Sequence, residues 1–182
     1  MARNTEWVYF SGKGSWFNKL TTPDMEYGNW QIKLNFNDES YQKFMKLKEP
    51  LEDGTEGILN EIKQDDEGFF HVFKRPIKKE YKDRNNVTQT IFFEPPVVLD
   101  GTKGKDVEPQ PWDKKVGIGN GSDITVKAEV YKYNKPFRKG KGRAIRLFSV
   151  LIESLIPYEQ KDFNPEQKKA AEGLNEQPRQ LF

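Results

Sequence analysis

The sequence predicts a mainly β domain with one short helix and long loops. Aromatic residues make up 13% of the chain although only 35% of it is hydrophobic, and large rings and β-branched side chains are typical of strands. Residues 30–36 alternate between apolar and polar side chains, which is the period of a strand with one buried face. With 182 residues, the chain is long enough for one domain with its own hydrophobic core.

The first half of the chain predicts two strands and the helix. Residues 5–19 predict a strand that bends at glycines and then continues, and residues 30–36 predict the next strand. Residues 37–40 offer side chains that cap a helix N-terminus, and apolar side chains at helical spacing follow over residues 41–48. Pro50 ends this short amphipathic helix.

The second half predicts a hairpin, a loop and two long strands. Residues 69–94 predict the hairpin, in which residues 69–79 form the first strand. Residues 100–115 form a long polar loop, and loops of this length are often functional. Residues 122–133 and 145–156 predict the last two strands, because apolar side chains alternate along both.

This succession of strands fits an OB-fold-like Greek-key barrel, and an antiparallel sandwich remains the alternative. The helix comes earlier than the helix of an ordinary OB-fold, so it is expected to be an insertion. Residues 1–156 are expected to form the domain, and residues 157–182 a flexible C-terminal tail. The core is expected to contain Trp30, Phe36, Phe44, Ile124, Val126, Phe148 and Leu151.

The chemistry of most enzymes is missing from the sequence. The chain has no cysteine and one histidine, and His71 lies in an aromatic strand without other metal-ligand types at ligand spacing, so it is interpreted as structural. No nucleophile stands beside a base in a known motif. We therefore expect no metal, no cofactor and no catalysis, and no apolar run is long enough for a membrane span.

Residues 127–146 interleave rings with cations. The net charge is only +2, so binding of a polyanion would depend on local patches such as this one. The apolar face of strand 122–133 is aliphatic, which leaves Tyr131 and Tyr133 on the other face. A surface that mixes rings with cations is typical of proteins that bind single-stranded nucleic acid. The expected stacking residues are Tyr131, Tyr133, Phe137 and Trp112, and the expected phosphate contacts are Lys74, Arg75, Arg138, Lys139, Lys141 and Arg143.

Three segments carry a resemblance to a known family. Residues 119–127 form a glycine turn that leads into a long strand, residues 131–134 read Tyr-Lys-Tyr-Asn, and residues 146–153 form a closing strand. A weaker match covers residues 23–34. Over about residues 117–156, the chain resembles the bacteriophage single-stranded DNA-binding proteins of the OB-fold type.

The resemblance implies binding of single-stranded DNA without sequence specificity, during phage replication, recombination and repair in the cytoplasm of the infected bacterium. It also implies that the C-terminal tail contacts replication proteins through a terminal aromatic residue, here Phe182. The family tail is strongly acidic, whereas residues 157–182 hold five acids and four bases, a net charge of −1. The oligomeric state is not predicted.

Two other functions remain open. The aromatic surface would also suit a β-domain that binds a host or phage enzyme. A nuclease is the third alternative, and it would require a metal site that the sequence does not offer.

Overall fold

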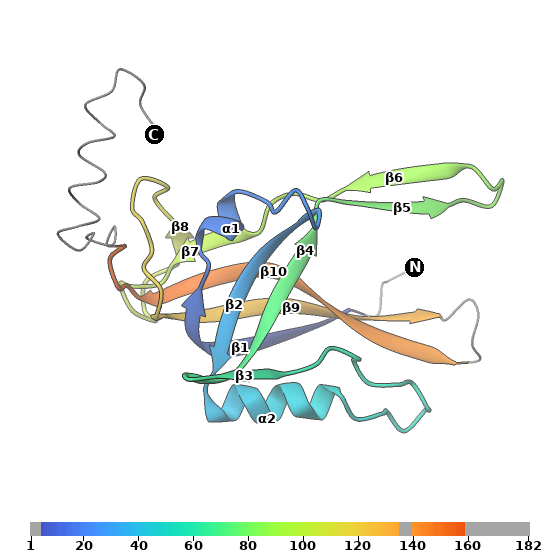
Figure 1. Cartoon of the computed structure of the whole chain (residues 1–182), viewed down its shortest axis with the longest axis horizontal. Helices are drawn as coiled ribbons and strands as arrows, with labels where there is room; N and C mark the ends of the chain where they lie inside the picture. The colour runs from blue at the N-terminus through green and yellow to red at the C-terminus, as the bar shows by residue number, and fades with distance from the viewer. Residues whose placement is uncertain (1–4, 135–139, 159–182) are drawn as a thin grey trace, which may run out of the picture.

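The computed structural model describes residues 5–134 and 140–158 of the chain (Figure 1). Neither helix in this part is long and apolar enough to cross a membrane. The elements in chain order are β1 (Thr5–Ser15), α1 (Asn18–Thr21), β2 (Asn29–Phe36), α2 (Asp38–Leu47), β3 (Lys63–Asp65), β4 (Gly68–Pro76), β5 (Lys78–Lys82), β6 (Thr88–Phe92), β7 (Val97–Asp100), β8 (Gln110–Pro111), β9 (Ser122–Asn134) and β10 (Lys141–Ser154).

Five of the strands form a barrel. The main sheet has the order β3-β4-β2-β1-β9-β10-β7-β8, and β10 also contacts β4, which closes the central five strands on themselves. This is the five-stranded Greek-key arrangement of an OB-fold. The structure therefore confirms the predicted fold class. β3 extends one edge of the sheet, β7 and β8 extend the other, and α2 lies below the barrel in the view of Figure 1.

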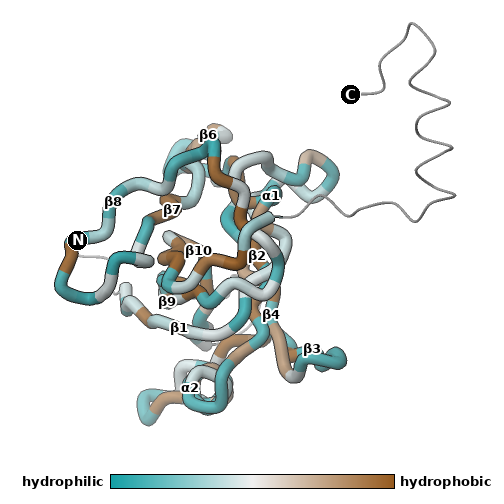
Figure 2. The backbone as a smooth tube through the Cα atoms, turned by 90° about the vertical axis from the view of Figure 1, so that its left-hand side faces the viewer, coloured by the Kyte–Doolittle hydropathy of each residue, from teal (hydrophilic) through white to brown (hydrophobic). Residues whose placement is uncertain are grey.

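Aromatic rings fill the centre of the barrel. The Phe10 ring lies 5.7 Å from Phe44 and 5.4 Å from Phe73, and Phe36 lies 5.3 Å from Phe44. Phe10, Phe44 and Phe73 are fully buried. α2 contributes Phe44 to this cluster, so the helix seals one end of the barrel. In Figure 2 hydrophobic colour follows β10 through the interior, whereas the turn at β3 is hydrophilic.

The helix forms as the sequence predicts. The Asn37 side chain accepts a hydrogen bond of 2.8 Å from the Ser40 N–H, which caps the first turn. Asp38 and Glu39 stand in that turn, where negative charge favours the helix dipole. α2 lies between β2 and β4, so it is an insertion relative to the usual OB-fold position, as expected.

The predicted hairpin at residues 69–94 is partly wrong. Residues 69–79 do not form one strand, because β4 ends at Pro76 and pairs with β2 and β3 in the main sheet. Proline has no N–H to donate to a neighbouring strand. The true hairpin is shorter and consists of β5 and β6, which form a separate two-stranded sheet.

The strand predicted over residues 5–19 ends at Ser15, and Asn18–Thr21 form a second short helix, α1, that was not predicted. The short strands β7 and β8 were not predicted either. β2 and β9 agree with the predictions to within one residue, whereas β10 begins at Lys141 and not at residue 145. At the predicted boundary of the tail, Pro157 forms a β-bridge with Ile118, so this residue lies against the domain. Residues 159–182 lie outside the described residues, and the expectation of a flexible tail stays a prediction.

Gly12 sits where β1 passes closest to β2. A Cβ atom at this position would overlap the backbone carbonyl oxygen of Asn35, and a backbone atom cannot move aside without disturbing the pairing of the two strands. We expect Gly12→Ala to lower the free energy of unfolding by about 1–3 kcal/mol. Chemical denaturation measures this change. Lys13→Ala alters an exposed side chain in the same strand and is the matched control. If both substitutions changed the free energy of unfolding by the same amount, the close approach of Gly12 to the Asn35 carbonyl would be contradicted.

His71 is structural in the described fold, and its burial predicts a pH dependence. Its ring packs 4.9 Å from Phe44 and 4.8 Å from Phe73. Burial, with help from nearby lysine charges, lowers the pKa of His71 to about 4 from 6.5. The unfolded chain therefore binds a proton in a pH range where the folded chain does not. Stability should fall by up to about 3 kcal/mol as the pH drops from 6.5 to 4.

The variant His71→Gln isolates this effect, because glutamine does not titrate. Its unfolding free energy should change less than that of the wild type between pH 6.5 and 4. Carboxylates with a lowered pKa, such as Asp53 at about 2, lose their contribution only at lower pH. Parallel pH profiles for the wild type and the variant would show that His71 does not carry the effect.

Candidate nucleic-acid interface

The outer face of β1 and β9 carries large side chains, whereas the inner face of both strands packs into the hydrophobic core. In β1, Trp7 and Tyr9 alternate with buried core residues and are 43% and 48% exposed. The register places Trp7 opposite Glu129 and Tyr9 opposite Lys127 in β9. Tyr131 comes two residues after Glu129, so it lies on the same side of β9 as Lys127 and Glu129. On its other side β9 buries alternate residues from Ser122 to Val130, whereas Lys132 and Asn134 are exposed, so the predicted division of this strand into two faces is confirmed up to Val130.

The side chain of Lys127 contacts three aromatic rings on this face, those of Trp7, Tyr9 and Phe148. The Lys127 Nζ lies 4.6 Å from the centre of the Trp7 ring, 5.2 Å from Phe148 and 5.8 Å from Tyr9. Trp7 and Phe148 meet edge to face at 4.7 Å. Lys127 makes no ion pair with a described residue. The Lys127 ammonium is therefore stabilised by cation–π contacts and by solvent, and it can attract an anion such as a phosphate.

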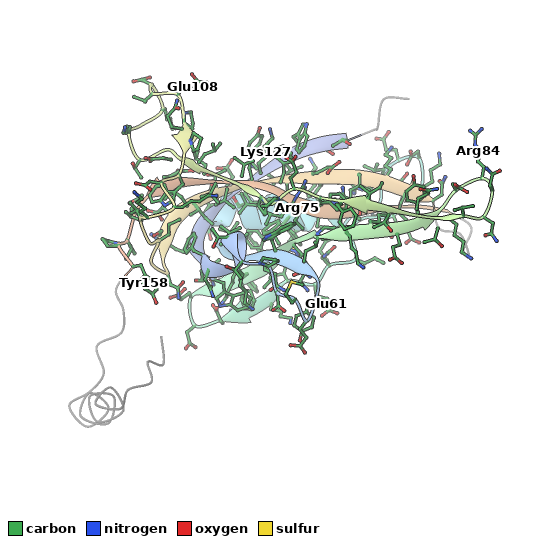
Figure 3. All side chains as sticks on the ribbon, turned by 90° about the horizontal axis from the view of Figure 1, so that it is seen from above. Glu61, Arg75, Arg84, Glu108, Lys127 and Tyr158 are labelled. Atoms are coloured by element: carbon green, nitrogen blue, oxygen red, sulfur yellow. The ribbon has the colours of Figure 1, made fainter. Side chains whose placement is uncertain are left out.

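Two arginines continue the pattern. The Arg146 guanidinium lies 4.6 Å from the Tyr131 ring and 4.7 Å from Phe93. Arg75 lies 5.3 Å from Phe93 and 5.9 Å from Phe148. Ring–cation contacts thus run from Tyr9 to Tyr131, although the Glu129 carboxylate also lies on this face, opposite Trp7. Figure 3 shows Lys127 and Arg75 close together in the view from above. We call this surface the aromatic–cation face; it consists of Trp7, Tyr9, Arg75, Phe93, Lys127, Tyr131, Arg146 and Phe148.

The two arginines differ in how they are held. Arg75 donates from Nε to the Glu94 carbonyl at 2.7 Å and from Nη1 to the Leu147 carbonyl at 3.2 Å. Burial, and then the charge of Arg146, lower the pKa of Arg75. Arg146 instead pairs with the Glu129 carboxylate at 3.3 Å. The positive charge of the face therefore rests mainly on Lys127 and Arg75.

The structure brings Tyr131 and Tyr133 to one side of the hairpin formed by β9 and β10. Tyr133 pairs with Gly142, and a Cβ atom at position 142 would lie 2.6 Å from the tyrosine ring. The Tyr133 ring therefore lies across the bare backbone of Gly142. Tyr131 belongs to the aromatic–cation face, and Tyr133 extends it toward the end of the hairpin.

Arg143 is placed differently from the prediction. It is 6% exposed, and its Nη2 donates to the carbonyl oxygens of Leu47 at 2.9 Å and Glu49 at 2.8 Å. These carbonyls stand at the C-terminal end of α2, where helices leave acceptors unpaired. Arg143 therefore fastens α2 to β10 and does not present its guanidinium to a phosphate. The sequence could not reveal this, since the basic loop and the helix end are far apart in the chain.

Of the other cations predicted to contact phosphates, Lys74, Arg75 and Lys141 lie in the described part of the chain, and Arg138 and Lys139 do not. Lys141 and Lys74 are exposed, but Lys74 lies next to Arg75 in a strand, so the two side chains point to opposite sides of β4. Arg75 joins the aromatic–cation face. Phe137, Arg138, Lys139 and Phe182 lie outside the described residues, and their predicted roles stay predictions.

Trp112 lies in a different place from the tyrosines. Its Nε1 donates to the Val116 carbonyl at 2.9 Å, and its ring lines an apolar cleft of about 870 Å³ together with Trp16, Pro96 and Tyr158. This cleft adjoins β7 and β8. Trp112 thus does not share a surface with Tyr131.

Sequence reasoning missed several members of the aromatic–cation face. Phe148 was expected in the core, but a register shift between Leu147 and Ser149 leaves it partly buried on the outer face. Trp7 and Tyr9 could have been found, because they alternate with Val8 and Phe10. Phe93 had no local signal, since its position depends on the two arginines that flank it.

Arg143 provides a test of the structural assignment. Arg143→Ala should lower the free energy of unfolding by about 2–4 kcal/mol, because two charge-assisted hydrogen bonds are lost and the Glu49 carbonyl loses its donor, whereas the Leu47 carbonyl keeps the Ile58 N–H at 3.0 Å. Urea denaturation measures the change. Lys141→Ala, an exposed neighbour, should change stability by less than about 0.5 kcal/mol. If Arg143→Ala were as stable as the wild type, the guanidinium would not fasten α2.

No protein-family model matches this sequence, and no curated protein matches it. The fold is similar to the crystal structure of gp2.5, a single-stranded DNA-binding protein encoded by bacteriophage T7, with a TM-score of 0.51 and 18% identity over 87% of this chain and 91% of that chain. The single-stranded DNA-binding protein from bacteriophage Enc34 matches with a TM-score of 0.47 and 15% identity over 90% of this chain and 89% of that chain. The similarity to the T7 protein confirms, at the level of fold, the resemblance to phage single-stranded DNA-binding proteins of OB-fold type.

Proposed function

We propose that this chain binds single-stranded DNA without sequence preference, and that the strand lies on the aromatic–cation face. The observation that carries the proposal is the continuous series of ring–cation contacts, with Lys127 4.6 Å from the exposed ring of Trp7 and Arg146 4.6 Å from Tyr131. Exposed rings offer flat surfaces to bases, and a cation without an ion-pair partner among the described residues, such as Lys127, can meet a phosphate. The OB-fold shared with the T7 protein supports the same function.

The face favours a single strand over a duplex for a physical reason. In a duplex, each base is covered on both sides by its neighbours, so rings such as Trp7 and Tyr9 have nothing to stack on. In a single strand the bases can leave their own stack and lie on aromatic side chains. Stacking accepts any base, because every base has a flat face, and the proposed binding is therefore independent of sequence.

The proposed biological role is to protect and organise single-stranded DNA during phage replication, recombination and repair in the infected cell. The names of the T7 and Enc34 proteins describe single-stranded DNA binding, and the role beyond binding rests on the family resemblance. The chain is proposed to act without catalysis. Within residues 5–134 and 140–158, no group of three or more acidic or histidine side chains is placed to hold a metal ion. The tail with Phe182 is proposed to contact replication proteins.

A protein-interaction domain is the second candidate, and the apolar cleft beside Trp112 is the observation that favours it. A cleft of about 870 Å³ with Trp16 and Tyr158 on its walls would suit an apolar segment of another protein. Such a contact would depend weakly on salt. Binding of DNA to the aromatic–cation face would instead weaken steeply as salt increases, because each neutralised phosphate releases a counterion.

A titration with labelled oligonucleotides tests the function. A single-stranded poly-dT oligonucleotide and a duplex of equal length are each titrated with the full chain at several salt concentrations. We expect tight, salt-dependent binding of the single strand and much weaker binding of the duplex. Equal affinity for both would overturn the proposal.

The position of the site is tested by Trp7→Ala combined with Tyr131→Ala. Each ring is expected to stack on a base, and stacking contributes about 1–3 kcal/mol per base. The double variant should therefore bind oligo-dT at least about tenfold more weakly at fixed salt. Tyr158→Ala removes an aromatic side chain that is 65% exposed and lies beside the apolar cleft. This control should bind oligo-dT as tightly as the wild type does. If Tyr158→Ala weakened binding and the double variant did not, the binding site would be the cleft and not the aromatic–cation face.

A further inference from the structure

We propose that the hairpin of β5 and β6 carries a second contact surface for single-stranded DNA, which continues the aromatic–cation face beyond the barrel. This inference rests on the proposed function and adds to it a longer path for the strand. The second surface, which we call the arm face, consists of Lys79, Tyr81, Gln89 and Ile91.

The hairpin projects from the barrel without cover from the described part of the protein. Every residue of β5 and β6 is exposed, and the two strands pair only with each other. Figure 1 shows the hairpin leaving the barrel in the same direction as the far ends of β9 and β10. An isolated hairpin of two strands is only marginally stable in water. Exposed Tyr81 and Ile91, at 45% and 39%, therefore point to a binding partner.

The register of the hairpin connects it to the aromatic–cation face. The Phe93 N–H donates to the Ile77 carbonyl at 2.8 Å, which continues the pairing of Lys78 with Phe92 by one step. Side chains alternate along a strand. Phe93, Ile91 and Gln89 therefore lie on one side of the hairpin.

The opposite strand adds a ring and a cation to that side. Lys79 pairs with Ile91, and Tyr81 pairs with Gln89, and side chains of directly paired residues lie on the same side of a sheet. Because the Phe93 ring lies between Arg75 and Arg146, the arm face begins where the aromatic–cation face ends.

The charges of the hairpin identify the kind of partner. On the other side of the hairpin, the Lys78 Nζ lies 3.8 Å from the Glu80 carboxylate, and Lys82 adds a second cation, so both sides have a net charge of about +1. The arm face differs in that it continues the side of Phe93, and its only acidic neighbour is Asp83 at the turn, which accepts from Gln89 at 3.0 Å. The arm face combines the cation of Lys79 with the ring of Tyr81 and includes no acidic residue. A partner with phosphates and flat bases fits this surface, as it fits the aromatic–cation face.

The length of the hairpin predicts how much DNA it adds. Five residue pairs join β5 to β6, and five residues of strand span about 17 Å. This length accommodates at most about five nucleotides, because the spacing of about 3.4 Å per phosphate in a stacked duplex is the lower limit for a strand whose bases have left their own stack. Figure 3 shows Arg84 at the far end of the hairpin, where it would meet the last phosphate of such a segment.

A matched pair of double variants tests the arm face in the full chain. Lys79→Ala with Tyr81→Ala removes a cation and a ring from the arm face. Lys78→Ala with Phe92→Ala removes the same two types of side chain from the opposite side. Both variants and the wild type are titrated with oligo-dT of about 8 and about 20 nucleotides at fixed salt. The shorter length lies within the site size of about 4–16 nucleotides of an OB-fold, and the longer one exceeds it.

The arm-face variant should bind the longer oligonucleotide at least about tenfold more weakly than the wild type, and the shorter one within about twofold. The opposite-side variant should match the wild type at both lengths. The inference would be overturned if both variants lost the same affinity for the longer oligonucleotide, or if neither lost any. In the second case, the exposed side chains of the hairpin would instead bind a protein partner. If the wild type bound neither oligonucleotide, the proposed function itself would fail.

Photo-cross-linking with the wild type covers the case in which a substitution unfolds the hairpin. An oligo-dT of about 20 nucleotides, with one iododeoxyuridine near either end, is irradiated in complex with the full chain. Mass spectrometry should find cross-links to the peptide that contains Tyr81 for one end of the oligonucleotide only. Cross-links confined to barrel peptides would overturn the inference.

Discussion

The Arg75 guanidinium holds together both the barrel and the proposed interface. From β4 it donates to the Leu147 carbonyl of β10, across the contact that closes the barrel. The same group lies over Phe93 and Phe148, and a second hydrogen bond to the Glu94 carbonyl fixes the segment that carries Phe93. Burial lowers the pKa of Arg75, yet an arginine stays charged at any physiological pH. The Arg75 side chain thus contributes both to the contact that closes the barrel and to the arrangement of the surface rings.

The hairpin of β9 and β10 has one supported side and one open side. On the supported side, Arg143 donates to carbonyls at the end of α2, the Glu56 N–H donates to the Lys141 carbonyl, and Lys132 pairs with Asp53 at 3.5 Å. Hydrogen bonds from Thr55 are the main reason that the pKa of Asp53 falls to about 2. The loop after α2 therefore supports the back of the hairpin. Tyr131 and Tyr133 remain on the open side, where they extend the same surface as Trp7.

The sequence predicted those features that depend on residues close together in the chain. Alternation along residues 122–133 was sufficient to separate the buried face of β9 from the face with Tyr131. Asn37 and Ser40 were sufficient to place the helix. Features that depend on distant contacts were missed. Arg143 looks like part of a basic loop until its contact with Leu47 is known, and Phe148 looks like core until the register shift in β10 is known. Phe93 gains its place in the face from its contacts with Arg75 in β4 and Arg146 in β10, which are distant in the sequence.

The central claim is that a single strand of DNA lies across the outer face of β1, β9 and β10. A crystal structure of the full chain with bound oligo-dT tests this claim most directly. Bases should be stacked on Trp7, Phe148 or Tyr131, with phosphates near Lys127 and Arg75. Bases found instead in the apolar cleft beside Trp112, with the aromatic–cation face empty, would contradict the account.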